Sequence, residues 1–169
     1  MNSVSSTTRK RIEAQGYLGL SDSDLAEVGP WLRLAPAMCM VWTGIATFYQ
    51  SEIALMILVP FAALGAILRG HPFETIYNYG IRHIVGTQRL PPAQAPRRFA
   101  CGVATIYLIV TIIAFHNGFP FVGQFFGFSL VAAAAFPTFT NFCIPSFIYG
   151  LIFGKPGSLD PDKGAHSAI

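Results

Sequence analysis

Two long apolar blocks dominate the pattern of hydrophobic and polar positions along the chain. No Asp, Glu, Lys or Arg occurs between positions 99 and 154, and the block over 34–68 holds Glu52 as its one charged residue. Apolar stretches of this length are typical of helices that cross a lipid bilayer. The pattern therefore predicts an integral membrane protein.

Short polar interruptions divide these blocks into helical segments. Tight turns are expected at 50–52 and 116–120, and Pro137 and Pro145 are expected to break the last segment, because proline lacks an N–H and disfavours helix before it. The expected spans lie at about 34–49, 53–68, 99–115 and 121–136, followed by a shorter helix over 142–153. This pattern predicts an all-α, four-helix transmembrane bundle made of two helical hairpins.

The cationic residues lie in the segments outside the spans, and neither hairpin tip carries one. They occur before the first span, in the loop over 69–98 and after the fourth span: Arg9, Lys10, Arg11, Arg33; Arg69, Arg82, Arg89, Arg97, Arg98; Lys155, Lys163. Because positive loops stay in the cytoplasm, both termini are expected there, in a bacterial inner membrane. The tails would be 1–33 and 154–169, flanking a membrane domain over 34–153. The polar start lacks a signal peptide's apolar segment, so the first span is expected to direct insertion.

Two polar segments are expected to hold short helices beside the membrane. Ser21 is a good N-cap for a helix that the pair at 29–30 ends. Pro72 and Glu74 favour the start of a second helix, which Gly86 ends, with apolar residues at helical spacing. That helix is expected to lie in the interface as an amphipathic element. Aromatic and long cationic side chains at the same level would anchor the spans: Trp31, Arg33, Arg97 and Arg98.

Composition adds one constraint on the partners. The chain is 53% hydrophobic and 11% charged, whereas ordinary soluble domains are about 25% charged. Its net charge of +3 comes from the cationic segments that set topology. The expected partners are therefore membrane lipids and other membrane subunits, and no nucleic acid.

Two short motifs resemble a known family. Pro-Arg-Arg-Phe-Ala opens the third span at 96–100, and Phe-Cys-Ile-Pro-Ser-Phe-Ile-Tyr occupies 142–149. Over about 36–153 the chain resembles a bacterial family of small membrane proteins classed as a conserved domain of unknown function. Its members carry a Phe-Cys-x-x-Cys segment with a tyrosine three residues later. Cys143 and Tyr149 match this pattern, but Ser146 replaces the second cysteine, which argues against dithiol redox or metal chemistry.

Titratable residues offer only weak candidate sites. Cys39, Cys101 and Cys143 fall in separate apolar segments, where cysteine usually acts as a small hydrophobe; thiol chemistry at Cys143 is the alternative. His71 and His83 share the central loop with Glu74 and are weak metal candidates, with packing or hydrogen bonding as the alternative. No metal site is expected.

His116 lies at the opposite membrane face. It is a weak candidate for holding the edge of a haem or chlorin, with helix capping as the alternative. The chain shows no phosphate-binding loop, nucleophile triad or carboxylate pair. We therefore expect no enzyme activity and no cofactor of its own.

Small residues predict close helix packing. Gly123 and Gly127 form a small-xxx-small motif on the fourth span, and Ala62, Ala66 and Gly70 repeat the spacing on the second. These faces would serve packing within the bundle or contact with another protein. The phenylalanine-rich region between positions 119 and 153 could contact lipids or pigments.

The expected function follows partly by elimination. A small, membrane-embedded chain without a catalytic motif fits an accessory or structural subunit of a larger membrane complex, such as a respiratory or photosynthetic one. The alternative is a small transporter, channel or thiol-handling membrane protein that acts as a homo-oligomer.

Overall fold

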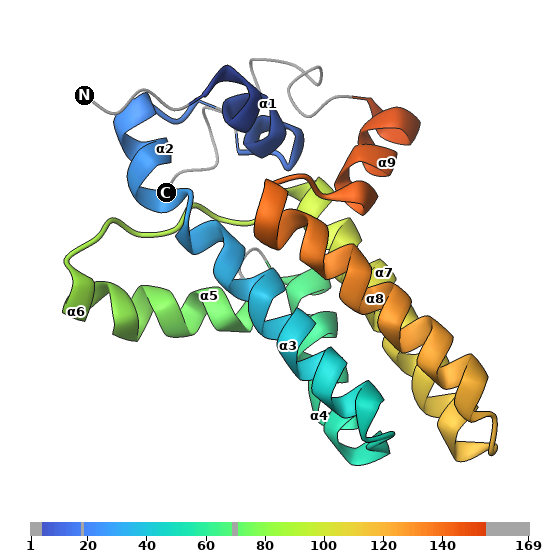
Figure 1. Cartoon of the computed structure of the whole chain (residues 1–169). Helices are drawn as coiled ribbons and strands as arrows, with labels where there is room; N and C mark the ends of the chain where they lie inside the picture. Colours follow the sequence, from blue (N-terminus) through green and yellow to red (C-terminus); the bar gives the residue numbers. More distant parts are fainter. Residues whose placement is uncertain (1–4, 18, 69–70, 155–169) are drawn as a thin grey trace.

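Every regular element in the part of the chain that the structure describes is helical. The computed structural model describes residues 5–17, 19–68 and 71–154. Its longest elements are α3 (Leu34–Phe48), α4 (Glu52–Ile67), α7 (Ala95–His116) and α8 (Pro120–Thr140). They form two hairpins, α3 with α4 and α7 with α8, whose tips lie at the same end of the molecule (Figure 1). The expected all-helical class is confirmed.

These four helices pack against one another and form what we call the helical core. α7 contacts both α4 and α8, and α3 also contacts both α4 and α8. Leu55 and Leu58 of α4 and Leu108 of α7 are fully buried between them. Trp42 on α3 donates a hydrogen bond from Nε1 to the carbonyl oxygen of Ala54 on α4, over 2.9 Å. Apolar burial and this bond fix the first hairpin.

Two helices are long and apolar enough to cross a membrane. They are α7, with 22 residues, and α8, with 21. A third candidate arises only if α4 and the following segment, 72–85, count as one span with a bend of 83°. α3 and α4 are shorter, with 15 and 16 residues. The structure thus indicates a membrane protein with two or three candidate spans, and the arrangement with four spans stays a proposal.

The helix boundaries differ from the sequence expectations at two points. α7 begins at Ala95 rather than at 99, so that Arg97 and Arg98 belong to its first turn. α8 continues through Pro137 to Thr140, beyond the expected end at 136. It ends because Asn141 adopts the left-handed region at φ 56°, which asparagine tolerates better than most residues. The short helix α9 (Ile144–Phe153) follows directly.

The central loop forms one helical segment that bends away from α4. It comprises α5 (Pro72–Ile76), a π-helical turn η2 (Tyr77–Ile81) and α6 (Arg82–Val85). Gly86 ends it at φ 69°, a conformation for which glycine carries no steric penalty. Tyr77 is fully buried, whereas Ile84 is exposed. The segment runs across the axes of the helical core, at the end away from the hairpin tips (Figure 1).

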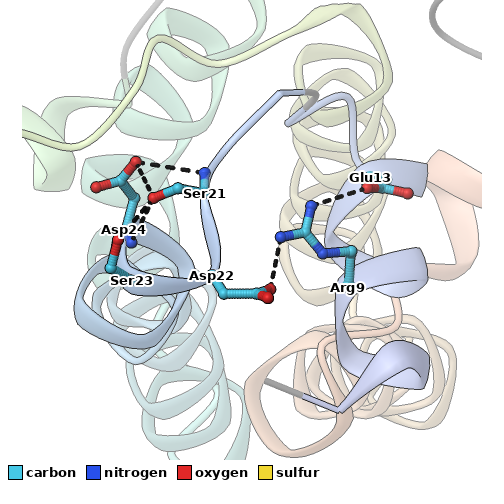
Figure 2. A network of polar contacts seen from close by, with 6 residues as sticks. All are labelled: Arg9, Glu13, Ser21, Asp22, Ser23 and Asp24. Atoms are coloured by element: carbon cyan, nitrogen blue, oxygen red, sulfur yellow. Dashed lines mark hydrogen bonds and ion pairs between the residues drawn. The ribbon is translucent and has the colours of Figure 1, made fainter. Parts of the chain in front are cut away.

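Polar residues hold two N-terminal helices together. α1 (Ser6–Ala14) and α2 (Asp22–Val28) precede a short 3-10 turn, η1 (Trp31–Arg33). Figure 2 shows Arg9 of α1 between Glu13 and Asp22, with its Nη2 donating to Asp22 Oδ1 over 2.6 Å. The Ser21 side chain caps α2 by accepting from the Asp24 N–H over 3.1 Å.

The same N-terminal region is bonded to the helical core. Gln15 Nε2 donates to the carbonyl oxygen of Asn141 over 2.7 Å, and Arg11 Nη1 donates to that of Thr140 over 2.9 Å. Arg33 Nε donates to Asn141 Oδ1 over 2.9 Å. α1, the residue Gln15 that follows it and η1 are therefore bonded to the end of the core where α8 stops, and α2 lies on the same side of the molecule (Figure 1).

Candidate functional site

A cavity of about 410 Å³ lies among α3, α4, α7, α8 and α9. Its walls are mainly hydrocarbon, and facing helices contribute small side chains to them. Six alanines line it: Ala35, Ala62, Ala100, Ala104, Ala133 and Ala134. Because short side chains on opposed helices do not meet across the gap, the helices can pack elsewhere and still leave this space between them.

All three cysteines of the chain line this cavity. Cys39 comes from α3, Cys101 from α7, and Cys143 from the residue that precedes α9. Each thiol is free and half-buried. Sequence reasoning placed them in separate segments and missed this convergence, since residues so far apart give no local signal. No group of three or more His, Cys, Asp or Glu residues within 5–17, 19–68 and 71–154 is placed to hold a metal ion.

A buried ion pair lies beside the cavity and contributes Arg97 to its wall. Arg97, at the cavity wall, pairs through Nη2 with Glu74 Oε1, and the two residues are only 7% and 2% exposed. Arg97 Nη1 also donates to the Tyr17 hydroxyl over 2.8 Å, and Nη2 donates to the carbonyl oxygen of Leu32 over 3.1 Å. The Arg97 charge is therefore matched inside the protein.

The start of α5 positions the carboxylate of this pair. Glu74 Oε2 accepts a hydrogen bond from the backbone N–H of His71 over 3.1 Å, and the N–H of Phe73 donates to His71 Nδ1 over 3.3 Å. This is a capping box with Pro72 in the first turn. The capping residues that predicted the helix start therefore also position the Glu74 carboxylate that neutralises Arg97.

His71 is a neutral group at the cavity wall. Burial lowers its pKa to about 4, and the Arg97 charge acts in the same direction. Since Nδ1 accepts the Phe73 N–H, the proton of the neutral ring lies on Nε2. Nε2 lies 3.1 Å from the point where a Cβ on Gly65 would stand, and Cys101 Sγ lies 3.1 Å from that same point. The His71 imidazole and the Cys101 thiol therefore both lie against Gly65.

Tyr17 completes the neutral surroundings of the cavity. Its side chain is buried, and burial raises the pKa of the hydroxyl above its usual range. The guanidinium carbon of Arg97 lies 5.5 Å from the centre of its ring. With the ion pair matched, and the phenol and imidazole uncharged, the described walls of the cavity carry no net charge.

Comparison with known proteins places the chain in a family. A family model described as "Domain of unknown function (DUF4395)" matches residues 30–153.

The chain belongs to the DUF4395 family.

This match confirms the resemblance inferred from the motifs. No curated protein and no solved structure matches the chain. The DUF4395 region includes Glu74, Arg97 and every residue that lines the cavity except Gln15. All but one of the residues that line the cavity therefore lie within the matched region, and α1 and α2 precede that region.

The serine that departs from the family motif has a packing role in this DUF4395 chain. Ser146 is buried on α9, and its Oγ donates to the carbonyl oxygen of Pro96 over 3.2 Å. It thereby ties α9 to the first turn of α7. Cys143 stands at the cavity wall without a second thiol at that position.

The histidines proposed from sequence lie far apart in the fold. His116 stands at the hairpin tips, where its Nδ1 lies 3.2 Å from Glu52 Oε2, so it joins the two hairpins. His83 is exposed on α6, whereas His71 is buried beside Gly65. The structure does not bring His71 and His83 together with a shared set of metal ligands.

The small residues proposed for packing lie at internal contacts. A Cβ at Gly127 would overlap Thr47 on α3, and one at Gly123 would overlap the ring of Phe115 on α7. Ala62 lines the cavity. Ala66 faces Gly102 of α7, where an added Cβ would lie 3.9 Å away, and Gly70 falls outside the described residues. The close faces of α4 and α8 thus contact neighbours within the chain.

The residues that were expected to anchor the spans at the membrane interface have defined partners within the protein. The Trp31 ring lies 4.8 Å from that of Tyr77, centre to centre. Arg98 donates to the last carbonyls of α4, with its Nε 2.9 Å from Ala66 O and its Nη2 2.8 Å from Ile67 O. Arg97 differs most, because it is buried in the ion pair rather than reaching toward lipid headgroups.

Proposed function

We propose that this chain is a membrane protein that binds a small, mostly apolar molecule inside its helical core. The cavity of about 410 Å³ is the observation that supports this proposal. Sites for small molecules commonly enclose roughly 300–1,000 Å³, with apolar walls and a few polar groups that set orientation. This cavity has such walls, and its polar groups come from α3, α7, α8, the loop before α5 and Gln15 at the end of α1.

The site would lie within the bilayer. In this proposal α3, α4, α7 and α8 all span the membrane, with both termini in the cytoplasm and the hairpin tips outside. α3 rises only about 22 Å at about 1.5 Å per residue, so η1 would extend it or the bilayer would thin locally. The cationic residues, which avoid the hairpin tips, support this orientation.

The thiols make the alternative of a thiol-handling protein concrete. A molecule in the cavity would touch sulfur atoms contributed by α3, by α7 and by the turn before α9. Uncharged thiols are soft, polarisable surfaces that suit an apolar body. The proposal gives them this contact role and assigns them no redox step.

A co-purification experiment tests the proposal. The full chain would be purified in mild detergent, and the molecules that leave with it in organic solvent would be identified by mass spectrometry. Ala133→Phe places a ring on the cavity wall, whereas Ala132→Phe places the same ring on the neighbouring, exposed position of α8. We expect one small apolar molecule to co-purify with the parent and with Ala132→Phe, and to be lost from Ala133→Phe. Equal recovery from both variants would contradict the proposal.

A second proposal, an accessory subunit of a larger membrane complex, is favoured by the exposed aromatic side chains of α8. Phe121, Phe125 and Phe139 are 86%, 68% and 71% exposed. They would face lipid, a pigment or a neighbouring subunit. Native mass spectrometry of the tagged chain distinguishes these cases, because a second subunit in fixed ratio supports an accessory role and a homo-oligomer contradicts it.

A further inference from the structure

One hydroxyl at the cavity wall stands out among the polar groups of the helical core. Thr43 on α3 is 1% exposed and lines the cavity. Its Oγ1 is buried and has no hydrogen-bond partner among the described residues. A buried hydroxyl without a partner costs roughly 1–3 kcal/mol. Such a group in an apolar site is a strong candidate for binding a ligand.

The serine and threonine hydroxyls of two helices in the core avoid this cost in a uniform way. On α7 and α8, five of them donate to the carbonyl oxygen four residues earlier, over 2.6 to 2.8 Å: Thr105, Thr111, Ser129, Thr138 and Thr140. Ser129 does so although it also lines the cavity. Thr43 makes no such bond to the carbonyl of Cys39, which leaves its hydroxyl free for another partner.

A second unpartnered hydroxyl provides an internal comparison. Thr47, one turn along α3, is 0% exposed, and its Oγ1 also has no partner among the described residues. It does not line the cavity, because its side chain packs against Gly127. Among the described residues, Thr43 alone combines an unpartnered buried hydroxyl with a place in the cavity wall.

The charges around the cavity favour an uncharged ligand. Arg97 is matched by Glu74 and is held by Tyr17 and by a backbone carbonyl. His71 is neutral and carries its proton on Nε2, the ring nitrogen that lies against Gly65. A charged ligand would lose its hydration without gaining a free counter-charge, which is unfavourable in an apolar site.

We propose that the Thr43 hydroxyl donates a hydrogen bond to a carbonyl oxygen of an uncharged, mostly apolar molecule held in this cavity. The inference rests on the proposed function, because it names the chemistry of the ligand in the same site. A lipid-soluble quinone and an ester of an acyl chain both carry such an oxygen. Both are apolar enough to dissolve in the bilayer that surrounds the core.

Equilibrium binding to the full chain in lipid nanodiscs tests this inference with three labelled probes. The first is a benzoquinone with a decyl tail and every ring position substituted, so that thiols cannot add to the ring. The second is methyl decanoate, which carries an ester on a chain of the same length. The third is decane, which has no acceptor. We expect saturable binding of the quinone, of the ester or of both, and weaker binding of decane.

Variants then separate the role of the hydroxyl from that of the cavity. Thr43→Val should weaken binding of the carbonyl probe about tenfold, and Thr43→Ser should restore it. Thr47→Val should leave binding unchanged, since the Thr47 hydroxyl also lacks a partner among the described residues but does not line the cavity. Ala133→Phe should abolish saturable binding by filling the space.

Three results would overturn the inference. These are competition by decane that equals that of both carbonyl probes, binding of the carbonyl probes by Thr43→Val that equals that of the parent, and the absence of saturable binding by any probe. The proposed function is judged separately, because the molecule that co-purifies with the parent and not with Ala133→Phe is identified without choosing a probe.

Discussion

Replacing Arg97 by methionine should destabilise the chain more than any neighbouring arginine substitution. Methionine keeps much of the volume but leaves Glu74, which is 2% exposed, without its counter-ion. Removing one partner of a buried pair costs about 3–5 kcal/mol, because the other charge stays desolvated. The Tyr17 hydroxyl and the Leu32 carbonyl lose a donor as well.

The assay is thermal unfolding of the purified chain in mild detergent. For a chain of this size, 1 kcal/mol corresponds to about 2–4 °C, so a loss of about 4 kcal/mol should lower Tm by roughly 10 °C. Arg98→Met is the matched control, since the Arg98 guanidinium donates to the backbone carbonyls of Ala66 and Ile67 and pairs with no carboxylate among the described residues. It should cost about 1 kcal/mol.

A double variant isolates the charge. In Arg97→Met, Glu74→Gln the amide oxygen still accepts the His71 N–H, but no buried charge remains. The double variant should therefore recover much of the stability lost by Arg97→Met alone. If the single and double variants melted together, or if Arg97→Met behaved like Arg98→Met, the buried pair would not have the role assigned to it.

Three further predictions follow from topology, packing and titration. Reporter fusions should score as periplasmic at Asn117 and as cytoplasmic at Gln94, and a periplasmic score at Gln94 would contradict the orientation. Gly127→Leu should lower the free energy of unfolding by about 1 kcal/mol or more, because α3 packs against Gly127. Gly80→Leu is the control and should have a smaller effect, since no atom lies within 4 Å of an added Cβ there; equal effects would refute the packing argument. Because the pKa of His71 is lowered from 6.5 to about 4 in the folded protein, the stability that neutral His71 contributes is complete above pH 6.5 and is lost as pH falls toward 4. His71→Asn should therefore flatten the decline in Tm over that pH range, and an unchanged slope would contradict the assignment.

The helical segments could be predicted because long apolar runs and short turns are local features. The hairpin turns, the start of α5 and the end of α6 at Gly86 all follow from residues within a few positions of one another. The end of α8 could not be placed, because Pro137 suggested a break, whereas the helix continues through Pro137 and ends at the left-handed Asn141. Local sequence patterns therefore predicted which helices form better than they predicted where those helices end.

The candidate site depended on contacts that no local pattern encodes. Arg97 resembles an interfacial anchor in the sequence, and only the fold brings Glu74 and Tyr17 to it. Cys39 and Cys101 belong to different hairpins and meet the same cavity because α3, α4 and α7 are packed together. The unpartnered hydroxyl of Thr43 likewise becomes visible only when every other helical hydroxyl can be compared with it.

An experimental density map of the full chain, purified from its native membrane without added ligand, tests the central claim most directly. The account predicts continuous density from a non-protein molecule between α3, α7 and α8, in contact with Thr43 and with at least one of the thiols that line the cavity. A map in which the helices close over that space, or in which side chains fill it, would contradict the proposal that this membrane protein holds a small molecule in its core.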